Sequence, residues 1–134
     1  MGTQFVVQIE NRPGSLGRFA RALAERGINI THCAAGGAGN VGYAMVETED
    51  DDATRAVLRS IGQSFVEGTP FTVEVEDRPG ALAEVADRLG LAGILINGLL
   101  IVGRRDGMVH LAITTDDDAR ARELLANHEV GAPA

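Results

Sequence analysis

Two short segments of the chain combine a helix start, a glycine and polar side chains in a way that suits the binding of a small anion. "ENRPGSL" covers residues 10–16, and "EDRPGAL" covers residues 76–82. Each lies between a strand-like segment and a helical pattern, so the first N–H groups of a helix should be unpaired there. Gly14 and Gly80 have no Cβ, which would let a carboxylate approach the backbone. The same residues are also compatible with a tight strand-to-helix turn that binds nothing.

Other arrangements of reactive side chains predict structure rather than chemistry. "GAGNVG", residues 37–42, fits the G-x-G-x-x-G dinucleotide pattern, but a strand-like segment follows it, so we expect a glycine-rich hairpin. The aspartates at 50–52 and 116–118 are consecutive, whereas calcium loops place ligands at alternate positions, so we expect them to open helices. Cys33 and His32 are neighbours on a predicted strand and face opposite sides, so we expect Cys33 to pack. These patterns predict no metal, no cofactor and no catalytic residues.

The two segments belong to a long internal repeat. Pro13 and Pro79 are 66 positions apart, and at this spacing the match extends in both directions without a gap. It includes three aspartates and an alanine at 50–53 and again at 116–119. We therefore predict two modules, residues 1–68 and 69–134, and we expect the last strand of the second to be short or missing.

Each module shows the same order of predicted elements. Residues 5–10 and 71–76 alternate in polarity as strands do, and residues 16–23 and 82–89 have apolar side chains at helical spacing. Two strands, a second helix and a last strand, at 64–67 in the first module, complete the order β-α-β-β-α-β. This order predicts an α+β fold, with a ferredoxin-like antiparallel sheet and both helices on one face. Because one sheet face and the sheet edges stay uncovered, we expect modules and chains to dock.

Composition argues against several classes of function. The formal net charge is −7, so the chain has few cations with which to build the basic face that nucleic-acid binding requires. The longest apolar run, residues 92–102, is too short for a membrane-spanning helix. Met1 is followed almost directly by a strand-like segment, so we expect no secretory signal. With one cysteine and no possible internal disulfide, the sequence favours a cytoplasmic location.

The paired segments "NRPGSLGRFARALAERGINI" and "DRPGALAEVADRLGLAGILI" resemble the signature of the ACT domain. The resemblance implies βαββαβ modules that bind amino acids where two modules pair, in regulators of amino-acid metabolism. It predicts a non-catalytic sensor of an amino acid or a similar small carboxylate, with a homodimer and a metabolic enzyme as candidate partners. The alternative is a regulatory subunit that docks onto an enzyme without a ligand of its own. A small enzyme on this scaffold is the least favoured class.

The resemblance places the ligand on the strand-to-helix loops and at the start of the second strand of each module. Asn11 and Asp77 are placed where their side chains could cap the helix amides of an empty site. The second copy has Leu95 where the first has Asn29, and Asn97 could replace that amide only if it faces the same way, so we expect the two sites not to be equivalent. The candidate ligand-binding residues are Asn11, Arg12, Pro13, Gly14, Ser15, Leu16, Asn29, Ile30, Thr31, His32, Asp77, Pro79, Gly80, Ala81, Leu82 and Asn97.

Overall fold

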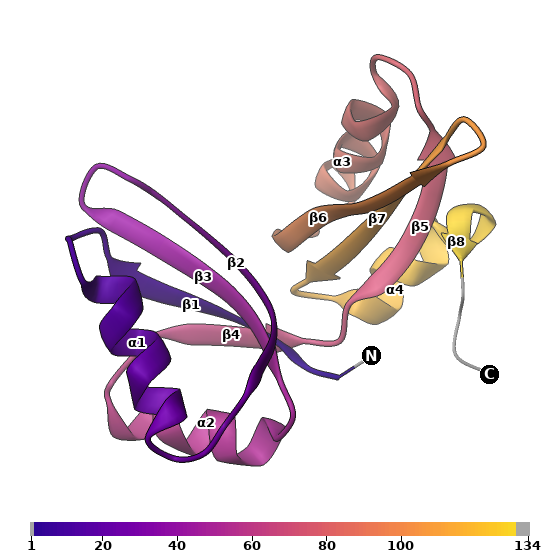
Figure 1. The fold of residues 1–134 in the computed structure, drawn as a ribbon. Coiled ribbons are helices and arrows are strands. Elements are labelled where there is room, and N and C mark those ends of the chain that lie inside the picture. Colours follow the sequence, from indigo (N-terminus) through magenta and orange to yellow (C-terminus); the bar gives the residue numbers. More distant parts are fainter. Residues whose placement is uncertain (1, 131–134) are drawn as a thin grey trace. The chain divides into compact units, whose positions relative to one another are not determined.

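The structure, a computed structural model, describes residues 2–130 (Figure 1). The chain divides into two compact units, Met1–Glu67 and Gly68–Ala134, which we call module 1 and module 2. Each contains an antiparallel sheet with two helices, in the order β-α-β-β-α-β. The α+β, ferredoxin-like fold predicted from the repeat is therefore confirmed.

Module 1 has a four-stranded sheet with the strand order β2-β3-β1-β4. Strands β1 and β2 both pair antiparallel with β3, which leaves β2 at one edge. Its elements are β1 (Gln4–Glu10), α1 (Ser15–Ala24), β2 (Ile30–Ala38), β3 (Val41–Thr48), α2 (Asp51–Ser60) and β4 (Phe65–Gly68).

Module 2 repeats this sheet with the strand order β6-β7-β5-β8. The last strand, β8, has two residues where β4 has four, and it pairs with β5. The elements are β5 (Phe71–Glu76), α3 (Ala81–Leu91), β6 (Ile96–Arg105), β7 (Met108–Thr115), α4 (Asp118–Leu124), the 3-10 turn η1 (Ala126–His128) and β8 (Glu129–Val130).

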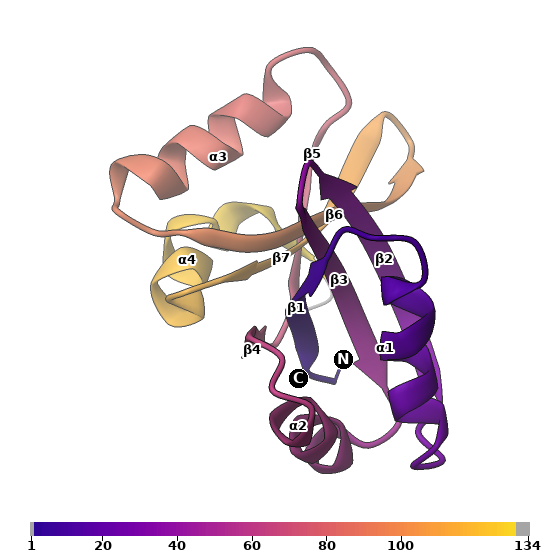
Figure 2. The ribbon, with the colours of Figure 1, turned by 90° about the vertical axis from the view of Figure 1, so that its left-hand side faces the viewer.

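Each core lies between the helices and one face of the sheet (Figure 2). In module 1 the alternate β1 residues Phe5 and Val7 are fully buried against Leu23 of α1 and Leu58 of α2. Burying a side chain of this kind stabilises the fold by roughly 1.5–3 kcal/mol. The strand period of two and the helix period of 3.6 thus place the apolar residues on facing surfaces.

A β-bulge interrupts the match between the two modules. Cys33 of β2 pairs with Val46, whereas Leu99, 66 positions after Cys33, pairs with Ile113, which is 67 positions after Val46. The register of β6 shifts between Ile101 and Gly103, so Val102 is the additional residue. The prediction of a gapless repeat is therefore wrong from this bulge onward.

The bulge changes which aspartates correspond. Asp50 is the N-cap of α2 and accepts a hydrogen bond from the Ala53 N–H at 2.9 Å. Its counterpart is Asp117, the N-cap of α4, and not Asp116 as the gapless repeat implies. Asp116 instead accepts from the Leu95 N–H at 2.9 Å. Aspartates therefore open both helices as predicted, but one of the six has a different task.

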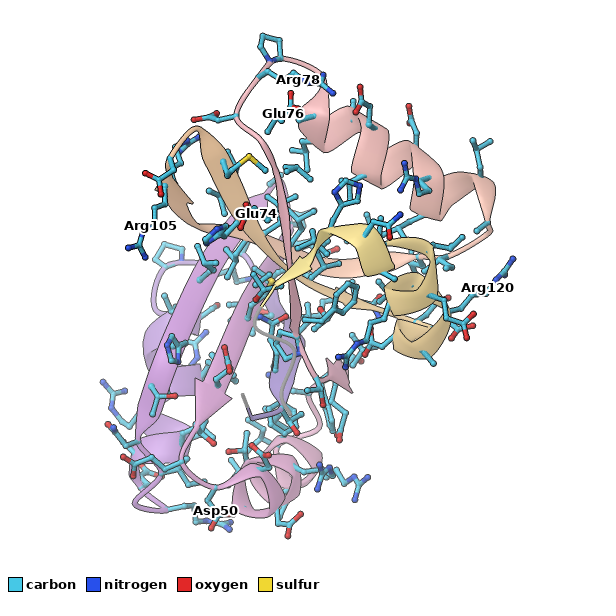
Figure 3. All side chains as sticks on the ribbon, turned by 90° about the vertical axis from the view of Figure 1, so that its right-hand side faces the viewer. Asp50, Glu74, Glu76, Arg78, Arg105 and Arg120 are labelled. Carbon is cyan, nitrogen blue, oxygen red and sulfur yellow. The ribbon has the colours of Figure 1, made fainter. Side chains whose placement is uncertain are left out.

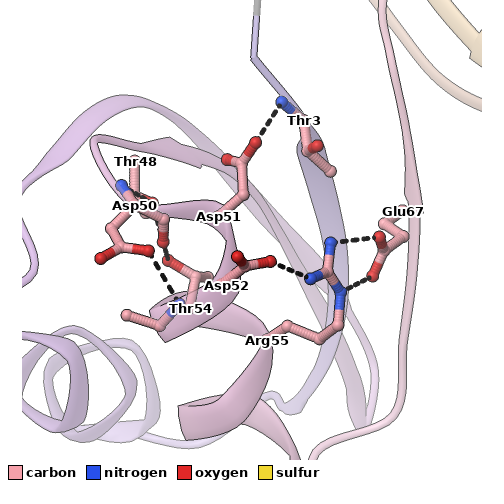
Figure 4. A network of polar contacts seen from close by, with 9 residues as sticks. Thr3, Thr48, Asp50, Asp51, Asp52, Thr54, Arg55 and Glu67 are labelled. Atoms are coloured by element: carbon pink, nitrogen blue, oxygen red, sulfur yellow. Dashed lines mark hydrogen bonds and ion pairs between the residues drawn. The ribbon is translucent and has the colours of Figure 1, made fainter.

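An ion-pair network joins the last strand of module 1 to α2 (Figure 4). The Arg55 guanidinium donates to both carboxylate oxygens of Glu67, at 2.7 and 2.8 Å, and to Asp52 at 2.8 Å. It also lies 5.8 Å from the centre of the Phe5 ring. The hydrogen bonds to Glu67 and Asp52 raise the pKa of Arg55, and the bond from Arg55 lowers the pKa of Glu67.

The glycine-rich segment 37–42 forms the tip of a hairpin. Strand β2 continues through Gly37 to Ala38, and β3 begins at Val41, so only two residues make the turn. No helix follows this segment, as a dinucleotide-binding turn would require.

Candidate functional site

The loop between β1 and α1 turns the chain into the helix through a left-handed glycine. Gly14 is the N-cap of α1 and has a φ of 87°, a conformation that side chains with a Cβ rarely adopt. The helix begins at Ser15, so Pro13 lies before the helix. The Ser15 N–H donates to the Arg12 carbonyl at 3.1 Å and closes the turn.

The start of α1 leaves backbone donors unpaired. Gly14 supplies no side-chain cap, and the N–H groups of Leu16 and Gly17 donate to no atom within the described part of the chain. The Asn11 side-chain oxygen accepts no hydrogen bond from them, and the Asn11 side-chain NH₂ donates to the Gly39 carbonyl at 3.0 Å. The predicted capping role of Asn11 is therefore wrong, and the donors are available to an anion.

Asn11 instead ties the loop to the glycine-rich hairpin. Its backbone N–H donates to the Asn40 carbonyl at 3.2 Å, so both amides of Asn11 bond the hairpin tip. A Cβ on Gly37 would lie 2.5 Å from the Asn11 side-chain oxygen, so another residue type there would displace the Asn11 side chain. Figure 1 shows the loop and the hairpin tip at the same end of module 1. The glycines of the hairpin thus let it support the loop.

Asp77 has the equivalent task in module 2. Its N–H donates to the Gly107 carbonyl at 2.9 Å, and its carboxylate lies 3.3 Å from the Arg104 guanidinium. Gly80 is the N-cap of α3, with a φ of 90° and no side-chain cap. The capping role predicted for Asp77 is therefore also wrong. In both modules the residue before Arg-Pro-Gly holds the hairpin tip.

The two helix starts differ in charge. Glu84 lies in the first turn of α3 and pairs with Arg78 at 2.8 Å, while Arg78 also pairs with Glu76 at 3.1 Å (Figure 3). These carboxylates raise the pKa of Arg78. The first turn of α1 has no acidic residue, and Arg18 stands 66 positions before Glu84. Negative charge is favourable at a helix start. Helix α3 has a carboxylate there, that of Glu84, whereas α1 has none.

The second-strand residues lie at the other end of α1 (Figure 1). The helix has ten residues and is therefore about 15 Å long. Asn29 lies 3.5 Å from the Glu49 carboxylate, and the Thr31 hydroxyl donates to the Glu47 carbonyl at 3.1 Å. One module therefore does not bring its loop and its second-strand residues together.

The remaining candidate residues occupy mixed positions. His32 is exposed and its Nδ1 lies 3.3 Å from the Thr31 hydroxyl, while Ile30 packs against the core. Asn97 takes the β-bulge position that Thr31 has in β2, and so does not replace Asn29. The other loop residues are exposed except Ser15 and Ala81, which are buried; the exposed ones are Arg12, Pro13, Leu16, Pro79 and Leu82.

Residues 3–65 match the family model of the ACT domain. Module 1 is an ACT domain. Module 2 repeats its fold and its Arg-Pro-Gly loop, so the chain contains two ferredoxin-like modules of one design. We found no curated protein whose sequence matches the chain.

Several solved structures share the fold of the whole chain. A protein from Bacteroides thetaiotaomicron is 19% identical with a TM-score of 0.62, and 96% of this chain and 91% of that chain align. The regulatory subunit of aspartate kinase from Thermus thermophilus, in its ligand-free form, is 17% identical with a TM-score of 0.55, over 94% and 91%. That from Thermus flavus is 16% identical with a TM-score of 0.56, over 93% and 90%. At these identities the likeness concerns the fold.

The ACT domain of module 1 also contains a groove that sequence reasoning missed. It has a volume of about 590 Å³ and lies between α1, the end of β1 and the turn from α2 to β4. Its lining comes from four separate stretches of sequence, so no local pattern announces it. The lining residues are Gln8, Ile9, Glu10, Ser15, Arg18, Phe19, Ala22, Asn40, Ile61, Gly62, Gln63 and Ser64.

The described residues of the two modules contain neither a metal-binding cluster nor a membrane-spanning helix. Within residues 2–130 no group of three or more histidine, cysteine, aspartate or glutamate residues could hold a metal ion. Cys33 is exposed on the edge strand β2, so the prediction that it packs is wrong. In the same part of the chain, no helix is both long and apolar enough to cross a bilayer.

Proposed function

We propose that the protein is a non-catalytic, cytoplasmic sensor that binds an amino acid or a similar small carboxylate where two ACT modules meet. The observation that carries this proposal is the start of α1. There the first-turn N–H groups of Leu16 and Gly17 are unpaired, a glycine leaves the backbone accessible, and no acidic side chain supplies the missing negative charge. The ligand carboxylate takes that place.

The separation of the two groups of candidate residues supports a site between modules. The loop of one module and the start of the second strand lie at opposite ends of α1, so a ligand reaches both groups only if they come from different modules. Two modules placed antiparallel beside their open β2-type edges would bring them together. Because Leu16 and Asn29 both belong to module 1, a site that uses both needs module 1 of two chains, so we propose a homodimer.

Within this site each group has a role set by its chemistry. The loop residues, with the amides of Leu16 and Gly17, receive the carboxylate. The side-chain oxygens of Asn29 and Thr31 and the His32 imidazole receive the ammonium or the side chain of the ligand. The site of module 1 binds the ligand more tightly, because in module 2 the Glu84 carboxylate already supplies negative charge at the helix start. The weaker site would use Asp77, Pro79, Gly80, Ala81, Leu82 and Asn97.

The functions of proteins with similar structures also support a regulatory role. Two of the similar structures are regulatory subunits of aspartate kinase, and one of them is described as ligand-free. A metabolic enzyme is accordingly our candidate partner. The second candidate function, a subunit that docks without a ligand, is favoured by the occupied helix start of module 2.

A thermal-shift screen of the full chain against the twenty amino acids separates these functions. A ligand present at a hundred times its Kd should stabilise the folded protein by about 2.7 kcal/mol and raise its Tm. Asn29→Ala should reduce that shift without lowering the Tm of the unliganded protein, because Asn29 is exposed. A flat profile for all twenty would favour the docking subunit, and turnover of a substrate would favour an enzyme.

A further inference from the structure

We propose that the groove of module 1 is a second binding site, contained within one module, for a small carboxylate that carries a branched or aromatic apolar group. Ser15 of the β1–α1 loop lines the groove, but Leu16 and Gly17, whose amides form the proposed amino-acid site, do not. The groove lies on the β4 side of α1, whereas β2 lies at the opposite edge of the sheet. This inference therefore goes beyond the sensor function.

The groove has the size of a small-molecule site, and its wall combines polar residues with a smaller set of apolar ones. Its volume of about 590 Å³ is within the range of roughly 300–1,000 Å³ that such sites have. Apolar side chains from three elements line it: Ile9 from β1, Phe19 and Ala22 from α1, and Ile61 from the end of α2. Ile61 is 42% exposed although it is a large apolar residue. An apolar group bound beside it would remove this surface from water.

A single cation stands at the wall of the groove. The Arg18 guanidinium donates to the Ser15 hydroxyl at 3.3 Å, and no carboxylate of the described residues pairs with it. Glu10 also lines the groove, and its carboxylate pairs with Arg12 at 3.3 Å. Arg18 can therefore offer charged donors to a ligand carboxylate, for which its planar fork is well suited.

Module 2 carries different residues at two equivalent positions. Arg88 stands where module 1 has Ala22, and its guanidinium donates to the Leu124 carbonyl at the end of α4, at 3.4 Å. Glu84 stands where module 1 has Arg18, so the charge there is reversed. Arg88 thus connects α3 to α4, and the Glu84 carboxylate would repel a ligand carboxylate. Module 1 has the small residue and the cation at these two positions.

The probe that tests this site is 4-methyl-2-oxopentanoate, which has a carboxylate and a branched apolar group. It is titrated into the full chain labelled with ¹⁵N, and amide chemical shifts are followed. We expect saturable shifts in residues 18–22 and 61–64. Two comparison compounds each lack one half of the chemistry: 4-methylpentan-2-one has no carboxylate, and glyoxylate has no apolar group. Both should bind at least about tenfold more weakly, because charge-assisted hydrogen bonds and apolar burial each contribute that much.

Two variants copy module 2 into module 1. Ala22→Arg should abolish the saturable shifts, and Arg18→Glu should weaken binding at least about tenfold. Arg21→Glu is the matched control, because Arg21 is exposed on the same helix and does not line the groove, and its Kd should equal that of the wild type. Should Ala22→Arg fail to fold, the comparison of Arg18→Glu with Arg21→Glu decides.

The proposal is overturned if the wild-type shifts do not saturate, if they map to residues 11–17 and 29–32, or if Arg18→Glu binds as Arg21→Glu does. These outcomes leave the sensor function standing, since that rests on the thermal-shift screen of amino acids. If the thermal-shift screen is flat but the groove residues show saturable shifts, the groove proposal stands and the sensor function does not.

Discussion

Two glycines three positions apart in module 1 should respond in opposite directions to the same substitution. Gly14 has a φ of 87°, so Gly14→Ala forces a side chain into the left-handed region. The new Cβ would also lie 3.3 Å from the Arg18 guanidinium. Gly17 lies within α1, and a Cβ there would meet no atom within 4 Å. Gly17→Ala therefore gains helix propensity with no steric contact.

The magnitudes follow from these geometries. Gly14→Ala should destabilise module 1 by about 1–2 kcal/mol, the strain of one left-handed residue. Gly17→Ala should stabilise it by about 0.5–1 kcal/mol. With a urea m-value of about 1 kcal/mol per M, the unfolding midpoint should fall by roughly 1–2 M and rise by roughly 0.5–1 M respectively.

The assay is urea unfolding of the ¹⁵N-labelled full chain, with the amide signals of each module followed separately. The signals of module 2 provide an internal control. Gly80 has a φ of 90° at the same place in module 2, so Gly80→Ala should lower the urea midpoint only of the module 2 signals. Equal shifts for Gly14→Ala and Gly17→Ala, in either direction, would refute the assignment of Gly14 as a strained helix start.

Three further substitutions test contacts of module 1. Asp50→Ala removes the cap of α2 and should lower the free energy of unfolding by about 1 kcal/mol in urea titrations. The bond from Arg55 lowers the pKa of Glu67 below its ordinary value of 4.5, so stability from this pair is present above that pH and is lost as pH falls through the lower value of the folded state. Glu67→Gln should flatten that acid dependence in unfolding curves. Asn11→Ala removes the bond to Gly39 and should speed hydrogen exchange at the hairpin tip.

The order of elements was predictable because the signals that define it are local. Alternation marks β1 and β5, helical spacing marks α1 and α3, and the recurrence of both at a fixed spacing identifies two modules. The bulge at Val102 was not predictable in the same way. All three aspartates at 50–52 match an aspartate 66 positions later, and two of them also match one 67 positions later. The identical residues therefore conceal a one-residue shift. Only the strand pairing reveals it.

The candidate site was predictable only in part. The loop, its glycine and its unpaired amides follow from the strand-to-helix turn. The hydrogen bond from Asn11 to Gly39 spans 28 residues and depends on where the hairpin tip lies. Asn11 also has a residue type that often caps helices, so the local rule favoured the wrong partner. The groove depends on residues from four stretches of sequence, which come together only through the packing of α1 against the turn after α2.

Glu84 gives module 2 a permanent internal counter-ion. A helix start that is neutralised by its own carboxylate has the same electrostatic environment whether metabolite is scarce or plentiful, so it can act as a constant scaffold. Under the function proposed above, the helix start of module 1, which has no such group, would change its charge balance when a ligand binds. On that proposal, the exchange between Arg18 and Glu84 at equivalent positions would separate a module that responds to the ligand from one that does not.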